Sequence, residues 1–256
     1  MRAKKSYGQH FLINESLCQR IVDVFDEYNN IQNVVEVGSG KGAITKYIIQ
    51  KNYNFKAIEA DQDMIEHLWL MYPMLQNKFL NEDFLISDLN TLYNGEEFSI
   101  IGNFPYNISS QIVFKIIEHK ELIPLSYGMF QKEVADRIVA PSGSKTYGIL
   151  SVIFQSFYDC TITQKISPGS FSPPPKVNSA MVMMKRKDDY TIPCDYKFFK
   201  TVVRTSFNQR RKMMRNSLKS LVGNPDLLKD EIFTKRPEQI TKEEFYDLTN
   251  KINNNR

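Results

Sequence analysis

The sequence predicts an α/β protein with a mostly parallel sheet, followed by a small helical domain. Two observations carry this prediction. Short β-rich runs alternate with stretches of helical apolar spacing over the first part of the chain, as in βαβ units. From about Asp188 onward the pattern is helical only. We therefore expect two domains, residues 1–188 and residues 189–256.

The first domain contains five strand-like runs separated by helices. The runs lie at residues 33–37, 55–60, 78–83, 98–104 and 125–131. The helices between them are predicted at residues 42–51, 62–72 and 109–120. Right-handed crossovers would place these helices on both faces of the sheet.

A late hairpin is expected to close the sheet. After a helix at 149–159, two further strand candidates at 161–167 and 179–186 flank the proline-rich loop 168–178. Since proline cannot donate to a strand ladder, this loop favours an antiparallel hairpin and a sheet of seven strands.

The C-terminal region is predicted to contain two helices. One covers residues 196–223 and ends at Gly223, a plausible C-cap. The other covers 241–253 and begins with Thr241 and Glu244, which have the spacing of a capping box.

Composition excludes several classes of protein. Hydrophobic residues make up 42% and charged residues 24%, as in ordinary globular proteins. No apolar run approaches the roughly 18 residues that a membrane span needs, and no secretory h-region follows the basic N-terminus. The three cysteines and three histidines have no disulfide or metal-ligand spacing. A cytoplasmic protein without a metal is expected.

The net charge of +4 is unevenly distributed. Residues 186–256 contain 16 Lys and Arg against 10 Asp and Glu, whereas the remaining residues contain 17 against 19. A basic C-terminal region favours a polyanion such as nucleic acid as the partner, although a merely solvated surface is the alternative.

A glycine loop follows the first of these strands. Gly38, Gly40 and Gly42 would let the backbone turn tightly and approach a ligand. Gly38, Gly40 and Ala43 loosely fit the dinucleotide pattern, so a nicotinamide or flavin cofactor stays open, as does a purely structural turn. The form E-x-G-x-G, from Glu36 to Gly40, is more typical of S-adenosylmethionine (SAM) methyltransferases.

Acidic residues follow the next two strands. Glu59 lies about 20 residues after the glycine loop, where a carboxylate can bind ribose hydroxyls, and Asp61 follows it. Asp83 can accept a bond from the adenine amine of SAM, while Phe84 packs on the ring. Each acid alone is more often a surface residue, but parallel strands bring all three sites to one sheet edge.

The stretch GNFPYN, residues 102–107, follows the fourth strand. The amine of adenine is a poor nucleophile, and acceptors aimed at its two N–H groups would favour its reactive form. The amide oxygen of Asn103 and the carbonyl of Phe104, which precedes Pro105, can supply these acceptors, and Tyr106 can stack on an extruded base. The alternative is a simple Asn-Pro turn.

At this point the sequence resembles the small-subunit (16S) ribosomal RNA adenine N6-dimethyltransferases of the KsgA type. The motifs that carry the resemblance are, in order, YGQHFL (7–12), VVEVGSGKGAIT (34–45), IEAD (58–61), GNFPYNIS (102–109), FQKEVADRIVA (130–140), YGILSV (147–152), FSPPPKVNSA (171–180) and FNQRRKMMRNSL (207–218). The large-subunit (23S) adenine methylases of macrolide resistance form the nearest competing family, but FSPPPKV and FNQRRK are more similar to the small-subunit enzymes.

The resemblance implies a Rossmann-like SAM-dependent methyltransferase fold and double methylation of two adjacent adenines near the 3′ end of 16S rRNA. It also implies a monomeric protein with a role in assembly of the small subunit, and an assembly factor without catalysis is a further alternative. By position, it implies SAM contacts at His10, Leu12, Gly38, Glu59, Asp83 and Asn103, and an adenine pocket at residues 103–106. The glycine motif and the third strand end add Gly40 and Phe84 to the predicted SAM site. The sequence departs from the family pattern at His10, where many members have Asn, and at Phe104, where Leu is more usual.

Basic residues of the predicted helix 196–223 would form its RNA-binding stripe. On a helical wheel they fall within about a 100° arc; they are Arg204, Arg211, Lys212, Arg215 and Lys219. Arg210 lies off the stripe and is expected to form an internal ion pair. Arg2, Lys4 and Lys5 of the N-terminal arm could add contacts.

Overall fold

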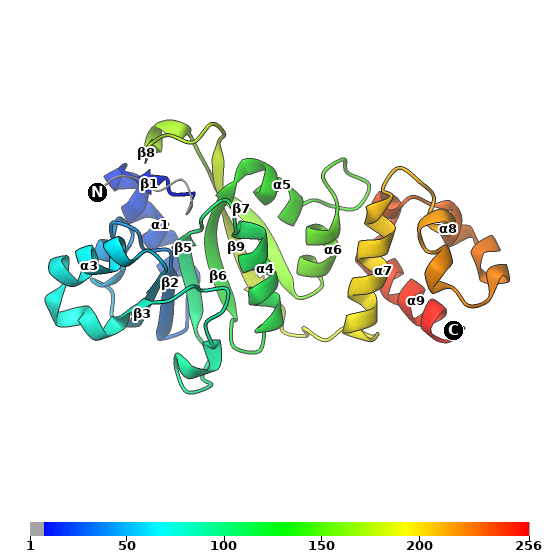
Figure 1. The fold of residues 1–256 in the computed structure, drawn as a ribbon, viewed down its shortest axis with the longest axis horizontal. Helices are drawn as coiled ribbons and strands as arrows, with labels where there is room; N and C mark the ends of the chain where they lie inside the picture. The colour runs from blue at the N-terminus through cyan, green and yellow to red at the C-terminus, as the bar shows by residue number, and fades with distance from the viewer. Residues whose placement is uncertain (1–7, 256) are drawn as a thin grey trace. The chain divides into compact units, whose positions relative to one another are not determined.

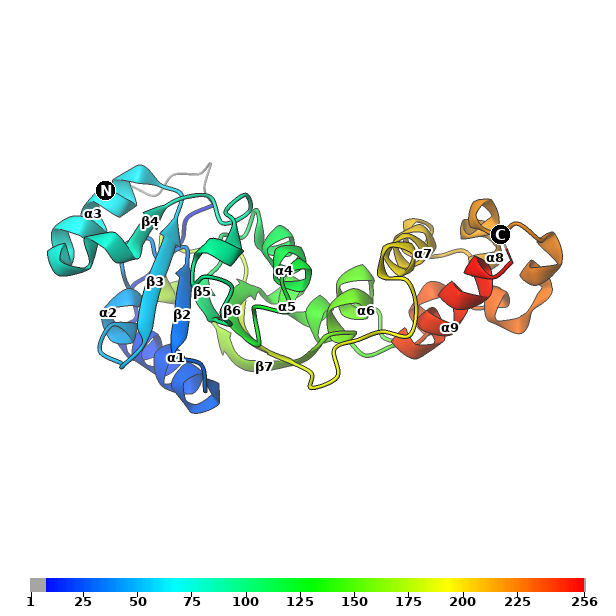
Figure 2. The ribbon, with the colours of Figure 1, turned by 90° about the horizontal axis from the view of Figure 1, so that it is seen from below.

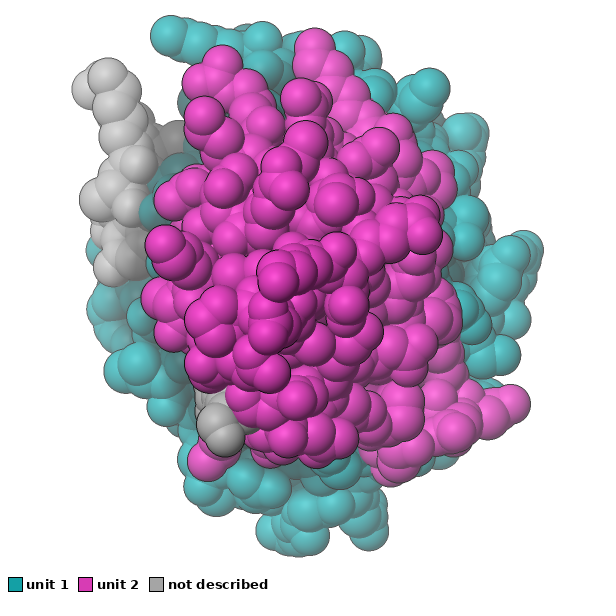
Figure 3. All heavy atoms as spheres, turned by 90° about the vertical axis from the view of Figure 1, so that its right-hand side faces the viewer, with its two compact units in different colours: residues 1–135, 159–186 teal, residues 136–158, 187–256 magenta. Residues whose placement is uncertain are grey.

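The computed structural model describes residues 8–255 (Figures 1 and 2). The described chain divides into two compact units, coloured in Figure 3. One contains residues 8–135 and 159–186, and the other contains residues 136–158 and 187–255. The C-terminal unit therefore includes an earlier stretch of the chain, 136–158, that lies outside the predicted domain 189–256.

The larger unit is built on a mostly parallel sheet of seven strands, as predicted. The strand order is β4-β3-β2-β5-β6-β9-β7. Its parallel strands are β2 (Asn33–Val37), β3 (Asn54–Glu59), β4 (Phe79–Asn81), β5 (Ser99–Asn103) and β6 (Leu125–Gln131). Their apolar, β-branched residues suit strands buried on both faces. The register pairs Glu36 with Ala57 and with Ile101, so the strands end at one edge.

Helices cover both faces of this sheet. Figure 2 shows α1 (Glu15–Tyr28) and α4 (Ser109–Glu118) on opposite sides of it. The two other helices of the parallel region are α2 (Thr45–Ile48) and α3 (Gln62–Met71). α1 was not predicted from the sequence, although Asn14 caps it and its buried Ile21, Val22 and Phe25 have helical spacing.

The late strands extend the sheet in the other direction. β9 (Ser179–Arg186) runs antiparallel to β6 and has β7 (Tyr158–Ile166) on its other side. The proline-rich loop between them contains β8 (Phe171–Ser172), which pairs with β1 (Phe11–Leu12). Figure 1 shows this two-stranded pair beside the N-terminal end of the described chain. The loop therefore fastens residues 11–12 beside the sheet.

The smaller unit is helical. It contains α6 (Ile149–Gln155), α7 (Tyr196–Asn208), α8 (Met214–Ser217) and α9 (Lys242–Asn253), while α5 (Lys132–Ile138) crosses the boundary between the units. Thr241 and Glu244 form the predicted capping box of α9. Short 3-10 segments occupy Lys219–Leu221, Pro225–Lys229, Glu231–Thr234 and Pro237–Gln239.

The prediction of one helix over 196–223 was wrong. α7 ends at Asn208, and the amide of Lys212 turns back to the carbonyl of Gln209 at 2.7 Å. The amide of Met214 donates to the carbonyl of Lys235 at 2.9 Å, and the Met214 side chain is fully buried. A tertiary contact replaces the next helical turn, so Gly223 caps no long helix.

Residues 8–255 show neither a membrane-spanning helix nor a metal-binding group. None of their helices has both the length and the apolar character to span a bilayer. Their His, Cys, Asp and Glu side chains form no group of three that could hold a metal ion.

Candidate active site

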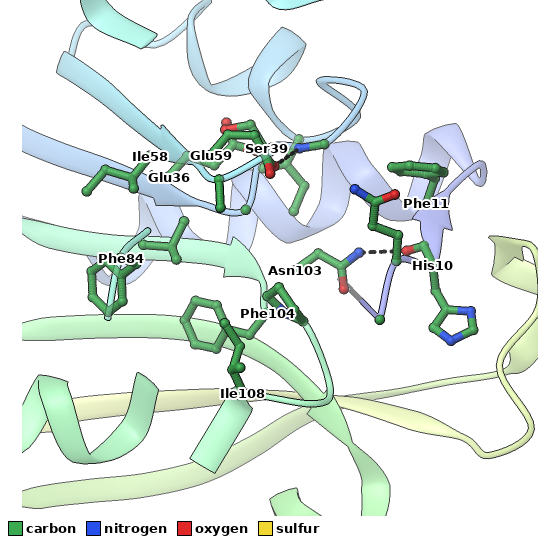
Figure 4. Close-up of a pocket in the computed structure, with 18 of the residues that line it drawn as sticks. His10, Phe11, Glu36, Ser39, Ile58, Glu59, Phe84, Asn103, Phe104 and Ile108 are labelled. Carbon is green, nitrogen blue, oxygen red and sulfur yellow. Dashed lines mark hydrogen bonds between the residues drawn. The ribbon is translucent and has the colours of Figure 1, made fainter. Parts of the chain in front are cut away.

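A cavity of about 280 Å³ lies at the carboxyl ends of β2, β3 and β5, within the larger unit (Figure 4). The structure brings together around it every residue that the sequence assigned to SAM or to the transfer step. These residues are His10, Leu12, Gly38, Gly40, Glu59, Asp83, Phe84, Asn103, Phe104, Pro105 and Tyr106. Parallel topology explains this convergence, since ligands of open α/β sheets bind beyond the carboxyl ends of the strands.

The glycine loop needs its glycines for backbone conformation. Gly38, Gly40 and Gly42 have φ angles of +76°, +52° and +80°, which side chains rarely allow. A Cβ atom at Gly38 would also lie 3.4 Å from the carbonyl oxygen of Asn103 and 3.5 Å from Pro105. The loop and the NFPY turn are therefore packed against each other.

Glu59 connects the glycine loop to the end of β3. One carboxylate oxygen accepts the amide of Gly40 at 2.8 Å, and the other accepts the amide of Asp61 at 2.9 Å. Burial raises the pKa of this carboxyl, and the two amides oppose that shift. Asp61 itself caps α3 and accepts a bond from Gln9 at 2.8 Å.

Glu36 is a second carboxyl in this cavity, and it was predicted only as part of the glycine motif. Its side chain is 1% exposed and accepts the hydroxyl of Thr45 at 2.6 Å. Burial raises the pKa of Glu36 to about 7. The group is therefore partly protonated near neutral pH.

The segment after β4 also lines the cavity, through Asp83 and Phe84. Asp83 is exposed and one of its oxygens accepts the amide of Leu85 at 2.9 Å, whereas the ring of Phe84 is buried. Lys115 of α4 is also buried, and its ammonium donates to the carbonyl of Ser87 at 2.5 Å and lies 5.5 Å from the Phe84 ring centre. Lys115 therefore fixes the segment that carries Asp83 and Phe84.

The amide of Asn103 has a defined orientation. Its nitrogen donates to the backbone carbonyl of His10 at 2.9 Å, as Figure 4 shows. Its oxygen has no donor among the described residues, and neither has the carbonyl of Phe104. Two acceptors, one from a side chain and one from the backbone, thus have no donor among the described residues, and both belong to residues that line the cavity.

The ring of Tyr106 is held from two sides. Its hydroxyl is hydrogen-bonded to the hydroxyl of Ser179, and burial raises the pKa of Tyr106. The His10 ring lies 5.4 Å from the Tyr106 ring at an interplanar angle of 30°. His10 Nδ1 donates to the carbonyl of Pro173 at 2.8 Å, so the His10 side chain joins the N-terminal segment to the proline loop.

Phe104 points its ring into the core. The ring is fully buried and meets Phe130 edge to face at 5.3 Å between centroids. A Cβ atom at Gly128 of β6 would lie 2.1 Å from the nearest Phe104 ring atom. The absence of a side chain at Gly128 therefore leaves the space that the Phe104 ring occupies.

Several lining residues were not predicted from the sequence. Gln9, Phe11, Lys41, Ile58, Asn107 and Ile108 also line the cavity. Lys41 lies over the Phe11 ring at 4.7 Å from its centre. Their proximity to Leu12, Gly40, Glu59 and Tyr106 in the chain is the signal that could have found them.

The predicted basic stripe belongs to the other unit and does not lie on one helix. Arg204 is on α7, Arg211 and Lys212 follow its end, Arg215 is on α8, and Lys219 begins a 3-10 segment. All five side chains are exposed. Arg210 pairs with Glu238 at 3.9 Å, in agreement with the expected internal ion pair. Arg2, Lys4 and Lys5 lie outside the described residues.

The fold and the cavity together define a Rossmann-like methyltransferase. Comparison with known proteins then narrows this class. The family model of the ribosomal RNA adenine dimethylases matches residues 1–254. The chain belongs to this family.

Named relatives agree with the family. The chain is 51% identical to ribosomal RNA small subunit methyltransferase A of Flavobacterium johnsoniae, over 98% of this chain and 96% of the relative. It is 46% identical to the protein of the same name from Bacteroides thetaiotaomicron, over 98% and 94%. The prediction of a KsgA-type methyltransferase is confirmed, and these relatives do not favour an oxidoreductase.

Solved structures share the fold. A dimethyladenosine transferase from Plasmodium falciparum gives a TM-score of 0.79 at 23% identity, covering 96% of this chain and 98% of its own. The 23S rRNA methyltransferase ErmE gives a TM-score of 0.68 at 21% identity, covering 94% and 99%. The two solved structures show the fold alone. The relatives at 51% and 46% identity, both named small subunit methyltransferases, favour the small-subunit group over the large-subunit alternative.

Proposed function

We propose that this protein transfers methyl groups from SAM to the N6 amines of two adjacent adenines near the 3′ end of 16S rRNA in the small ribosomal subunit. The observation that carries the proposal is the pair of open acceptors, Asn103 Oδ1 and the Phe104 carbonyl, beside the Tyr106 ring. The names of the relatives support the choice of the small subunit.

The residues around the cavity fit SAM. A cavity of about 280 Å³ with an apolar lining, a buried carboxylate and a glycine loop suits a nucleoside with a charged tail. Glu59 would bind the ribose, Asp83 the adenine amine, and Phe84 the adenine ring. The remaining part of bound SAM would lie against Gly38, Gly40, Leu12 and the His10 backbone. Bound SAM supplies a methyl group activated by the sulfonium sulfur.

Asn103 and Phe104 would bind the amine of the target adenine. Two acceptors on its N–H groups favour a pyramidal nitrogen, whose lone pair is no longer delocalised into the ring. They also stabilise the positive charge that develops on nitrogen during transfer. The bond from Asn103 Nδ2 to the His10 carbonyl keeps the amide oxygen directed away from that carbonyl, so no rotation is needed on binding.

Tyr106 would stack on the extruded base. Its hydroxyl bond to Ser179 and its contact with His10 hold the ring in place before RNA binds. Stacking compensates for the unstacking of the base from RNA. Pro105 fixes the backbone between the acceptor carbonyl and this ring.

Residues 189–256 would form the RNA-binding domain, with residues 1–188 as the catalytic domain. Arg204, Arg211, Lys212, Arg215 and Lys219 are exposed cations that can contact phosphates. Such a substrate implies action in the cytoplasm and a role in biogenesis of the small subunit. We expect the protein to act as a monomer.

The test is incubation with labelled SAM and undermethylated small subunits, followed by mapping of the modified nucleotides. Label on two adjacent adenines of 16S rRNA is expected. Label on 23S rRNA, or subunit binding without any transfer, would contradict the proposal.

A further inference from the structure

A second cavity, of about 190 Å³, lies in the larger unit between the start of α1 and the chain that leads from β7 to β8. Most of its lining is polar. Its lining includes Asn14, Ser16, Arg20, Lys165 and Ser170. Nothing in the proposed transfer chemistry uses this cavity.

Its charge is positive and uncompensated. Neither Arg20 nor Lys165 has an ion pair or hydrogen bond with any described residue, and both are exposed. The nearby carboxylate of Glu15 is bound by Lys46 and by Tyr47. An anion in the cavity would therefore meet two free cations.

Backbone and hydroxyl donors add to this charge. Asn14 caps the 14-residue helix α1 by accepting the amide of Leu17 at 3.1 Å, which leaves the amides of Glu15 and Ser16 without an intrahelical acceptor. Ser170 is only 7% exposed, and its hydroxyl has no partner in the part of the chain that the structure describes. Ser170 lines the cavity, so this hydroxyl is a further donor for a ligand there.

The cavity adjoins the candidate active site. Leu12 lines the active-site cavity and Asn14 lines this one, and two residues span at most about 7 Å. On the other strand, Phe171 pairs with Leu12, and the preceding Ser170 accepts the amide of Ile13 at 3.0 Å. The β1–β8 pair therefore separates two neighbouring sites.

We propose that this second cavity binds a phosphodiester of the rRNA backbone beside the target adenines. An extruded base leaves its flanking phosphates at the mouth of the base pocket. Arg20 and Lys165 would neutralise one of them, and the α1 amides and the Ser170 hydroxyl would orient it. This inference rests on the proposed function and adds an anchor for the substrate.

The test is the double variant Arg20→Gln/Lys165→Gln with undermethylated small subunits. We expect affinity for the subunit to fall about tenfold, and the slope of log affinity against log salt to become shallower by about 1 to 2. SAM affinity and kcat at saturating subunit should stay within twofold. Lys185→Gln is the matched control. This lysine is exposed, and the strand register places it beside Leu125, the first residue of β6, so it lies outside the second cavity.

Unchanged affinity and salt slope in the double variant would overturn the proposal, and so would an equal loss of SAM affinity. A titration with inorganic phosphate separates this result from failure of the proposed function. Amide shifts at Glu15 and Ser16 that saturate in the native protein and vanish in the double variant would support an anion site even if no rRNA is methylated. Absence of such shifts in the native protein would count against the site.

Discussion

The strand-end cavity and the basic segment 204–219 hold their polar groups in opposite ways. In the cavity, Glu59 is 8% exposed and accepts two amides, and Asn103 is tied to the His10 carbonyl. In the basic segment, Arg211 and Arg215 are exposed and have no partner among the described residues. Fixed groups suit a reaction that needs one geometry, whereas free cations suit a polyanion bound mainly by its charge. Changes in the first region should alter the reaction, and changes in the second should alter binding.

The largest effect is expected for Asn103→Ala. Loss of one of the two acceptors should lower kcat by about 10²- to 10³-fold, since removal of one preorganised polar partner has this cost in other enzymes. Binding of the small subunit should be unchanged. Single-turnover methylation and subunit binding would be measured in parallel with Asn33→Ala, a control at the first residue of β2, whereas Asn103 is the last residue of β5. A subunit-binding defect equal to the catalytic defect would remove the distinction between the two regions.

The next effect concerns Glu36 and the pH dependence of the free energy of unfolding. Burial raises the pKa of Glu36 from 4.5 to about 7, so the folded state binds its proton more tightly than the unfolded state does. The stabilisation from this proton is complete below pH 4.5 and is lost as the pH rises through 7. Relative to the native protein, Glu36→Gln should therefore gain roughly 3 kcal/mol of unfolding free energy between pH 4.5 and 8.

Urea unfolding of both proteins at several pH values measures this difference. A constant difference across the range would mean that Glu36 is ionised throughout in the folded protein.

A comparable or smaller effect is expected for the double reversal Arg211→Glu/Arg215→Glu. Affinity for undermethylated subunits should fall about 10- to 100-fold, with a shallower salt slope, because two phosphate contacts are replaced by repulsion. SAM affinity and unfolding free energy should be unchanged, since both side chains are exposed and free of partners among the described residues. Lys197→Glu, at an exposed position of α7, is the matched control. A parallel loss of stability would show that these arginines are structural.

The smallest effect tests how tightly the core supports the NFPY turn. Gly128→Ala should cost about 1 to 3 kcal/mol of unfolding free energy, because its Cβ atom would lie 2.1 Å from the Phe104 ring. Phe104→Leu should relieve part of this cost, and a double-mutant cycle would measure the coupling. Additive effects would mean that the ring moves away without penalty.

Much of the parallel half could be predicted from the sequence. The run 125–131 coincides with β6, and the run 33–37 with β2, since buried parallel strands are short apolar segments with helices between them. The prediction of converging strand ends needed only the order of these elements. It did not need the lengths of the helices, which differ from the prediction: 42–51 was expected where α2 covers only Thr45–Ile48.

The C-terminal half shows where a local pattern is insufficient. Residues 204–221 contain no proline or glycine, and their apolar residues have helical spacing, so nothing local marks the end of α7 at Asn208. The end is set by Met214, which is buried and donates its amide to Lys235, more than twenty residues later in the chain. Helical propensity of a few tenths of a kcal/mol per residue is easily overridden by such burial.

By itself the sequence determined which residues meet at the edge of the sheet, because strand order alone brings the glycine loop, Glu59, Asp83 and Asn103 to one side. Only the tertiary structure decided how each group is held. The bond from Asn103 to the His10 carbonyl joins residues 93 positions apart, and the bond from His10 to Pro173 joins residues 163 positions apart. Hydrogen bonds of this kind depend on positions in space that no local spacing encodes, and they decide which oxygen atoms stay open for a substrate.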